Sequence, residues 1–287
     1  SLESLFTQSD MAIITEATIW LPMGAENAFA IAAASDDLEG LVDAFRICES
    51  LGLRIASQIY NRSKVEKLFF GRARPVGLEI PPGDWVAIAP VYPASALHVV
   101  ADKALLMEKL DKVQSCTTME LPLSGSLGPF NGRPYANDDV LLGMLYRWGE
   151  TQTGQGVDPQ RDKCGILWGC YAAPLLGKPL KRACALVDNI LSGHDFGVYQ
   201  AIHTISERAC LVFIQLSFPH HRGDYAVQAL KVLTRELNSS GFPPYRLPVG
   251  MGGVPPSNDA HDEVVEAIRN VLDPSSVFAR GKYTAER

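Results

Sequence analysis

FAIAAASDDLEGLVDAFRICESLGLRIASQIY, residues 29–60, is the stretch that predicts the fold. Its apolar start, Phe29–Ala34, is typical of a strand, and the polar Ser35-Asp36-Asp37 that follows offers a helix N-cap. Apolar residues then recur at helical spacing until Gly52, at Leu38, Leu41, Val42, Phe45 and Cys48. Leu53–Tyr60 follows as a second extended segment. The stretch therefore predicts a strand, a helix and a strand in succession.

The same order of elements recurs along the chain. The second copy has strand-like segments at Trp85–Tyr92 and Ser115–Leu121 around a helix capped by Ser95, with apolar residues at Leu97, Val100, Ala104, Leu105 and Leu110. The third has strands at Gly165–Tyr171, Phe196–His203 and Arg208–Ser217 and helices at about Pro179–Leu191 and at Gly223–Leu237. Helices return between strands without strict Rossmann alternation or a GxGxxG turn. This predicts an α+β fold, with a large antiparallel sheet and helices packed on one face.

Three other segments complete the expected organisation. Residues 11–21 alternate and are rich in β-branched side chains, which predicts a strand pair or a bent strand that ends at Pro22. Asp138-Asp139 opens a helix that runs to Trp148, and the Gly-, Gln- and Thr-rich residues 149–163 are expected to be a mobile excursion.

Composition narrows the class of protein. The 287 residues are 47% hydrophobic and 20% charged, the balance of a globular protein with one large or two ordinary domains. A net charge of -6 argues against nucleic-acid binding, and the basic run Lys64–Arg74 is interpreted as an ordinary surface helix and loop. No apolar run is long enough for a membrane span, so we expect the chain as given to be soluble. A cytoplasmic location is a separate expectation. Six scattered cysteines without a CxxC pair predict buried thiols and no zinc site.

The segment Gly241–Arg246, GFPPYR, is the first candidate site. Its two prolines fix φ just before Tyr245 and Arg246, which places this pair on a stiff, non-helical segment. A phenol hydroxyl beside a guanidinium can hold a phenolate or a carboxylate, because arginine stays charged and offers a planar fork of donors. An ordinary surface turn is the alternative interpretation.

Three stretches in order resemble the vanillyl-alcohol oxidase and p-cresol methylhydroxylase family of FAD enzymes. They are FTQSDMAIIT leading to IWL near the start, Tyr245-Arg246, and LDPSSVFARGKY near the end. The resemblance covers the C-terminal part of a family member. It implies that residues 1–22 end the FAD-binding domain, that 23–242 form a cap (substrate) domain with ferredoxin-like units, and that 243–287 return to the FAD-binding domain.

The resemblance also implies roles for particular residues. Tyr245 and Arg246 match the catalytic pair that binds a substrate phenolate. The substrate pocket would be walled by Tyr199, His203, Glu207 and Arg208, and strand alternation puts Tyr199 and His203 on one face. The residues that would lie against the flavin are Gly165, Arg280, Lys282 and Tyr283. Gly165 falls near the place of a histidine that some members join to the flavin, so noncovalent FAD is expected, with Tyr171 or Tyr146 as weak candidates for a tether.

The resulting hypothesis is the C-terminal part of an FAD-dependent oxidoreductase that takes hydride from a para-substituted phenol, such as a 4-alkylphenol or a 4-hydroxybenzyl alcohol. A homodimer and a cytochrome or oxygen as electron acceptor are implied with it. One alternative is a 2-hydroxyacid dehydrogenase in which Arg246 binds carboxylate. Another is that this chain alone is a noncatalytic oligomerisation module, because its sequence contains no glycine-rich pyrophosphate loop.

Overall fold

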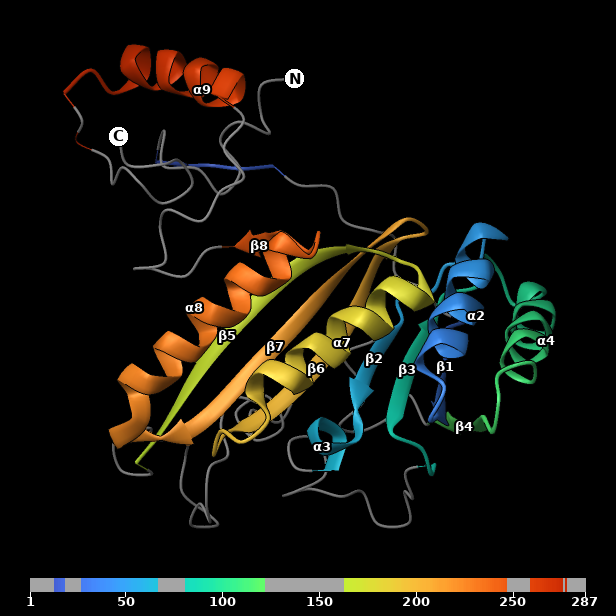
Figure 1. Cartoon of the computed structure of the whole chain (residues 1–287). Helices are drawn as coiled ribbons and strands as arrows, with labels where there is room; N and C mark the ends of the chain where they lie inside the picture. Colours follow the sequence, from blue (N-terminus) through green and yellow to red (C-terminus); the bar gives the residue numbers. More distant parts are fainter. Residues whose placement is uncertain are drawn as a thin grey trace. The chain divides into compact units, whose positions relative to one another are not determined.

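The computed structural model describes residues 13–18, 27–66, 81–121, 163–246, 259–275 and 277. Its elements, labelled in Figure 1, are β1 (Phe29–Ser35), α2 (Leu38–Ser50), β2 (Gln58–Asn61), α3 (Arg62–Lys64), β3 (Trp85–Val91), α4 (His98–Leu110), β4 (Thr117–Leu121), β5 (Cys164–Pro174), α7 (Gly177–Leu191), β6 (Gly197–Ser206), β7 (Ala209–Pro219), the 3-10 helix η3 (His220–Arg222), α8 (Gly223–Ser239), β8 (Pro244–Arg246) and α9 (Asp259–Leu272). The chain divides into a larger compact unit, Met23–Pro243, and a smaller one, Ser1–Pro22 with Pro244–Arg287.

The strands form one eight-stranded sheet in the order β4-β1-β3-β2-β6-β7-β5-β8. The run β1-α2-β2-β3-α4-β4 is a ferredoxin-like βαββαβ unit, and β5-α7-β6-β7-α8-β8 repeats it with the same internal strand order. The two units join where β2 pairs antiparallel with β6, at Gln58↔His203 and Tyr60↔Ala201. The expected α+β fold with a large antiparallel sheet is confirmed.

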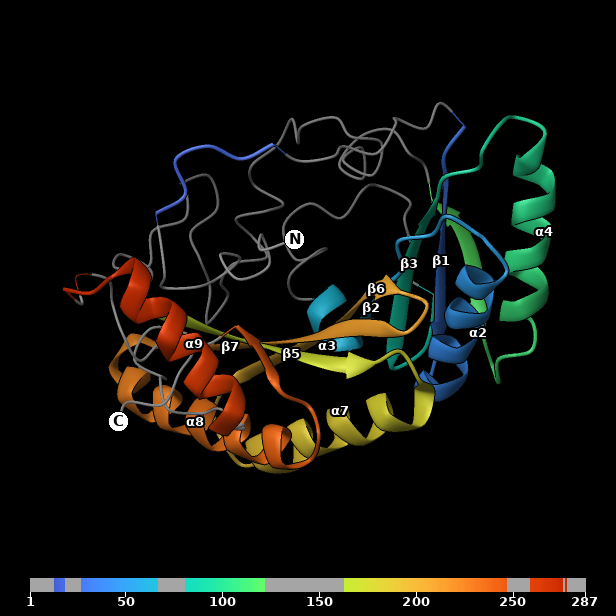
Figure 2. The same ribbon diagram turned by 90° about the horizontal axis from the view of Figure 1, so that it is seen from above.

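The long helices lie on one face of this sheet. Figure 2 shows α7 and α8 along one side of the strands and α3 on the other. The Tyr171 hydroxyl of β5 lies 2.8 Å from the Thr234 hydroxyl of α8, and the side-chain amide of Gln200 in β6 donates to the Asp188 carboxylate of α7 at 2.6 Å. These bonds join the sheet to the helices that bury their apolar stripes against it.

Local sequence signals explain two of these helices well. The Asp37 side chain accepts a hydrogen bond from the Gly40 amide at 3.0 Å, which satisfies one of the unpaired donors at the start of α2. The expected apolar stripe of α8 is buried together with Thr234, at Ala226, Ala229, Leu230, Leu233 and Leu237. Both helices were therefore predictable from spacing and capping alone.

Other expectations were wrong. Residues 13–18 have no regular structure, and Ile13 is 75% exposed, so their β-branched alternation does not mark a strand. The strand expected at Leu53–Tyr60 begins only at Gln58, after Ile55 has made an isolated bridge to Val91. A polar and apolar alternation fits a sheet only where a neighbouring strand is in register with it.

The apolar stripe expected for the α4 helix is confirmed only at Leu110, which is buried. Leu97 is 90% exposed and Val100 is exposed as well, whereas Leu106, which was not expected, is buried. Leu97, not Ser95, occupies the N-cap position, and the Ser95 hydroxyl instead lies 2.8 Å from the His98 ring. The helix expected between Asp138 and Trp148 and the excursion over 149–163 lie outside the described residues.

The smaller unit contains α9, which ends at Leu272 just before Asp273-Pro274, where the proline cannot continue the helix. The Asp273 carboxylate then accepts from the Val277 amide at 2.8 Å.

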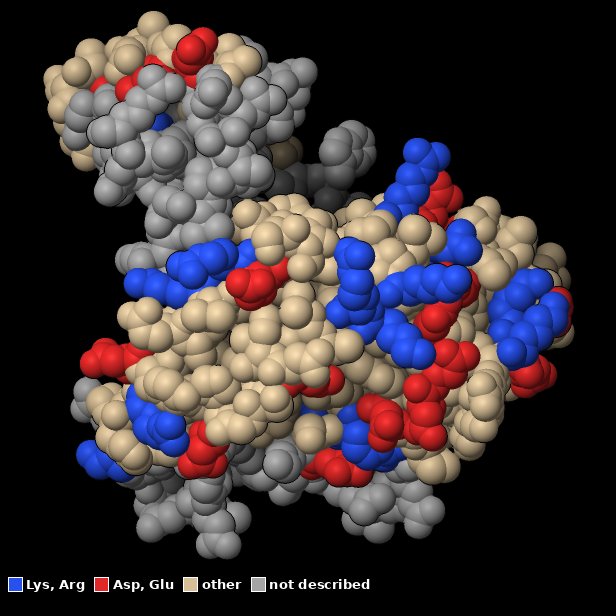
Figure 3. Space-filling view, viewed as in Figure 1, with Lys and Arg blue, Asp and Glu red and all other residues tan. Residues whose placement is uncertain are grey.

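None of the helices in the described ranges is long and apolar enough to cross a membrane. The surface over α7 and α8 in Figure 3 carries Lys and Arg side chains interspersed with Asp and Glu, so no single sign of charge dominates this side.

Candidate functional site

The candidate site lies on the face of the sheet opposite α7 and α8, here called the α3 face. Side chains alternate along a strand, so the residues between those that contact the helices belong to this face. By the strand register they include Gln58 and Tyr60 of β2, Tyr199, Ala201 and His203 of β6, Phe213, Gln215 and Ser217 of β7, and Trp168 and Cys170 of β5. Towards β4 the face becomes apolar, with small residues of β1 packed beside Val86, Ile88 and Leu121. Aromatic and polar groups are thus concentrated over β2, β6, β7 and β5.

The short helix α3 is held on this face by the Asn61 side chain. Its carboxamide oxygen accepts from the backbone amide of Lys64 at 3.2 Å and from the backbone amide of Gln200 in β6 at 3.1 Å. The same carboxamide donates to the Val198 carbonyl at 3.4 Å. One side chain therefore caps α3 and connects it to β6.

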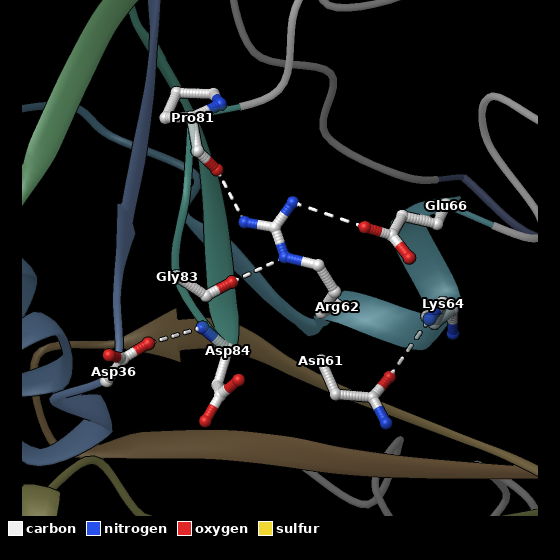
Figure 4. Close-up of polar contacts among 8 residues, drawn as sticks. All are labelled: Asp36, Asn61, Arg62, Lys64, Glu66, Pro81, Gly83 and Asp84. Carbon is white, nitrogen blue, oxygen red and sulfur yellow. Dashed lines mark hydrogen bonds and ion pairs between the residues drawn. The ribbon is translucent and has the colours of Figure 1, made fainter.

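Arg62 fixes α3 from its other side, as Figure 4 shows. Its guanidinium donates to the carbonyls of Pro81 and Gly83 and lies 3.4 Å from the Glu66 carboxylate. Gly83 has φ +145, and a Cβ there would meet the Ser35 backbone at 2.6 Å, so only glycine allows this close approach. The backbone of α3 is thus tied to β6 and to the segment before β3.

Lys64 projects from α3 into the aromatic part of the face. Its side chain is buried, with 4% exposure, and its ammonium lies 5.5 Å from the Tyr60 ring centre and 5.4 Å from that of Trp168. Burial lowers the pKa of Lys64 to about 8. None of the described strand residues on this face is Asp or Glu, and among the described residues no carboxylate pairs with Lys64. A protonated amine therefore sits between two aromatic rings without a neutralising anion in the described part of the chain.

His203 lies close to the same group. Its ring centre is 4.7 Å from that of Phe213 and 5.9 Å from that of Tyr60. Burial, and secondly the charge of Lys64, lower the pKa of His203 to about 4. The imidazole is consequently neutral near pH 7, and Lys64 supplies the positive charge of this surface.

The structure brings together two of the four residues expected to bind substrate. Tyr199 and His203 share the α3 face, and Tyr199 is buried. Glu207 and Arg208 instead lie exposed on the turn between β6 and β7, where they form an ion pair with each other at 3.3 Å. An exposed pair of this kind contributes little to stability and does not join the cluster around Lys64.

Tyr245 and Arg246 form most of β8 and are both exposed. The Arg246 guanidinium lies 5.9 Å from the Tyr245 ring centre, so the two side chains are close to each other. They belong to the smaller compact unit. Arg280, Lys282 and Tyr283 lie outside the described residues. The catalytic role of the pair and the flavin contacts of the tail stay predictions.

Gly165 lies in β5 opposite Phe218 of β7. A Cβ at Gly165 would come within 2.4 Å of the Phe218 ring, so the space of a side chain is already filled. Gly165 shares its strand face with Tyr171, which points to the helices and is bonded to Thr234. Burial raises the pKa of Tyr171 to about 12. Neither residue reaches the α3 face, whereas Tyr146 lies outside the described residues.

Lys64, the first residue of the basic run, is buried and is not the surface residue that the sequence suggested, whereas residues 67–74 of the run lie outside the described residues. A buried, aromatic-bound lysine at its start is the main feature that sequence reasoning missed. The one local signal was Asn61, a good N-cap three residues before Lys64. The second ring beside the Lys64 ammonium is that of Trp168. It comes from β5, far along the chain, so no sequence signal near Lys64 could predict this contact.

Metal ligation finds no support among the residues that the structure describes, which contain no cluster of three His, Cys, Asp or Glu side chains suited to an ion. Burial raises the pKa of the Cys48 thiol to about 11 and that of Cys210 to about 12, and raises that of Cys184 as well. These three thiols are buried and stay protonated near neutral pH, so they are poor nucleophiles.

Comparison with known proteins identifies the class that this fold defines. The chain has the fold of the C-terminal part of the FAD-linked oxidases of the vanillyl-alcohol oxidase and p-cresol methylhydroxylase type, which confirms the resemblance inferred from the sequence. p-Cresol methylhydroxylase with substrate bound matches it with a TM-score of 0.78 at 17% identity, over 100% of this chain and 58% of that one. 4-Ethylphenol oxidase from Gulosibacter chungangensis, in complex with isoeugenol, matches with a TM-score of 0.64 at 12% identity, over 92% of this chain and 55% of that one.

A relative is also found by sequence. The chain is 23% identical to 1'-carboxy-chondrochloren decarboxylase from Chondromyces crocatus, over 98% of this chain and 60% of that protein. A scan against known protein families finds no match. The chain thus spans about 60% of the length of the decarboxylase and 58% of that of the p-cresol enzyme. At these identities the solved structures establish the fold, and the activity is a separate question.

Proposed function

We propose that this chain is the substrate-covering part of an FAD-dependent oxidoreductase that takes hydride from a para-substituted phenol. Two of the proteins that share its fold, p-cresol methylhydroxylase and 4-ethylphenol oxidase, are named for such phenols. The observation that carries the proposal is the α3 face, where the ammonium of Lys64 lies over the rings of Tyr60 and Trp168, and Tyr199 and His203 share the same face. This wall combines aromatic surface with a single buried positive charge, which suits a phenol that reacts as its anion.

The chemistry requires that charge. Hydride leaves a benzylic carbon more readily when the oxygen para to it is negative, and a nearby cation lowers the pKa of a bound phenol. Among the described residues of the α3 face the cation is Lys64. Arg246 beside Tyr245, in the smaller unit, is a separate candidate predicted from the sequence. His203 is neutral near pH 7, so it adds no positive charge. The described residues therefore bind and orient the phenol, and the Lys64 cation stabilises its anion.

FAD would supply the redox chemistry by accepting the hydride. The α3 face fits a wall beside a flat ring, since Trp168, at 38% exposure, offers aromatic surface. We expect FAD to be held noncovalently, because Gly165 cannot form a bond and Tyr171 is buried against α8. A homodimer, with a cytochrome or oxygen as electron acceptor, belongs to the same proposal.

A second candidate reaction is the FAD-dependent decarboxylation of an aromatic acid. Two observations favour it: the sequence relative is named a decarboxylase, and the α3 face carries a buried ammonium that suits a carboxylate. The 2-hydroxyacid alternative depends on Arg246 alone, which the structure leaves exposed on β8.

Anaerobic mixing of the whole, FAD-loaded protein with substrate separates these reactions. p-Cresol is expected to bleach the flavin absorbance in a single turnover, whereas D-lactate leaves it unchanged. An aromatic acid that bleaches the flavin with release of carbon dioxide, when p-cresol does not, would favour the decarboxylase. A flavin that no phenol reduces would overturn the main proposal.

A further inference from the structure

Lys64 stands out among the buried charged groups of the larger unit. A buried ammonium costs free energy unless an anion or a set of hydrogen bonds compensates for it. The described structure offers two aromatic faces, at 5.5 Å and 5.4 Å, which return only part of that cost. Such a cation is suited to receive an anion from outside the chain.

We propose that Lys64 is the anion-binding residue of the α3 face and that it receives the oxyanion of an aromatic ligand, whose ring lies against the wall formed by Tyr60 and Trp168. The proposal rests on the proposed function, which it deepens by naming the residue and the charge of the substrate. Phenolate and aromatic carboxylate share this chemistry, and the experiment below distinguishes them.

The position of Lys64 is fixed before any ligand arrives. Asn61 holds the Lys64 backbone amide at 3.2 Å and connects it to β6, and Arg62 ties the same turn to Pro81 and Gly83 (Figure 4). The backbone of Lys64 is held by these bonds, and its ammonium already lies over the Tyr60 and Trp168 rings. A site prepared in this way loses less conformational entropy on binding than a surface lysine would.

No other described group competes with a ligand for this charge. Glu66, on the same turn, is engaged by Arg62 at 3.4 Å. His203 is neutral, and on the four strands beneath Lys64 no described residue of this face is a carboxylate. The groups that titrate or carry charge around it are Tyr60 of β2, Tyr199 and His203 of β6, Cys170 of β5, and Arg62 and Glu66 of α3. At neutral pH the protonated Lys64 is therefore the attraction for an incoming anion.

The test is isothermal titration calorimetry on the whole protein with its FAD. The probes are 4-nitrophenol above its own pKa, benzoate, and the neutral 4-nitroanisole. Lys64→Met removes the charge and keeps the length of the side chain, and Lys64→Arg keeps the charge. Lys178→Met makes the same charge change at an exposed position on α7, on the other side of the sheet, and serves as the matched control.

Lys64→Met is expected to weaken binding of at least one anion by roughly 10- to 100-fold, the effect of losing a hydrogen bond to a charged group. Binding of 4-nitroanisole and the affinities of Lys178→Met should stay as in the wild type, and Lys64→Arg should retain part of the anion affinity. Wild-type anion affinity should also fall as pH rises through about 8, with no such fall in Lys64→Met. The stronger of the two anions identifies phenolate or carboxylate as the ligand.

Equal anion affinities in the wild type and Lys64→Met, or no binding of either anion by the wild type, would overturn the proposal. A melting temperature for each variant excludes unfolding, and Lys64→Arg tests the charge even if Lys64→Met does not fold. If phenols reduce the flavin but Lys64→Met binds anions normally, this inference fails and the proposed function stands. If anions bind through Lys64 and no phenol reduces the flavin, the proposed reaction fails instead.

Discussion

Replacing Lys64 by methionine should stabilise the folded protein at neutral pH. Burial lowers the pKa of Lys64 from 10.5 to about 8, so keeping its proton in the folded state costs about 3 kcal/mol, at ~1.4 kcal/mol for each pKa unit. The side chain is only 4% exposed, so solvent screens this cost little. Its contacts with the Tyr60 and Trp168 rings return about 1 kcal/mol in all. A net gain of about 2 kcal/mol is expected for Lys64→Met.

The pH dependence gives the sign of the effect. The unfolded chain holds the Lys64 proton up to about pH 10.5, whereas the folded chain releases it above about pH 8. The cost is therefore complete below pH 8, shrinks between pH 8 and 10.5 and is absent above that window. Over this window the wild type should gain stability relative to Lys64→Met as pH rises.

Urea unfolding of both proteins at pH 7 and at pH 10.5 measures this difference. Other groups that titrate in the same window, such as the tyrosines and cysteines, are present in both proteins and cancel in the comparison. A methionine variant that is less stable than the wild type at pH 7 would refute the reasoning. A stability difference that does not change with pH would refute it too, since the buried charge would then not be its cause.

Three further outcomes are expected. Gly165→Ala should cost about 1–3 kcal/mol in urea unfolding because its Cβ meets the Phe218 ring at 2.4 Å, and the loss should shrink in a Phe218→Leu background; equal losses in both backgrounds would contradict the contact. Lys64→Met should raise the pKa of His203 above about 4, because one of its two lowering causes is removed, and an unchanged imidazole titration by NMR would rule out the coupling. Arg246→Ala should slow flavin reduction by p-cresol about a hundredfold, with Arg246→Lys intermediate. A folded Arg246→Ala variant that reduces flavin at the normal rate would show that the pair is structural.

Much of the fold was predictable because its signals are local. The α2 helix has its cap at Asp37 and its apolar spacing within one short stretch, and α8 has the same kind of stripe. The return of helices between strands then predicted an antiparallel sheet with helices on one face, and the family resemblance implied its ferredoxin-like units. The wrong predictions concern segments whose structure depends on a partner that is distant in the sequence. Ile13 and Ile14 look like strand residues but are exposed.

In the candidate site, too, local signals were readable from the sequence and contacts between distant segments were not. Alternation along β6 was enough to place Tyr199 and His203 on one face. It could not reveal Lys64, because a lysine in a basic run looks like a surface residue until the fold brings Trp168 over it. Glu207 and Arg208 were grouped with the site because they follow a strand of this face; the structure places them exposed on the turn, and their role in substrate binding stays a prediction. Burial of a charge depends on tertiary packing and leaves no periodic trace.

The α3 face of the sheet is expected to be the substrate-binding face. A crystal structure of the whole, FAD-loaded protein with bound 4-nitrophenol would show whether the substrate lies there. We expect the ligand ring to lie against Trp168 and Tyr60, with its oxygen at hydrogen-bond distance, about 2.8 Å, from the Lys64 ammonium. A ligand bound on the side of α7 and α8, or bound without contact to the α3 face, would contradict it.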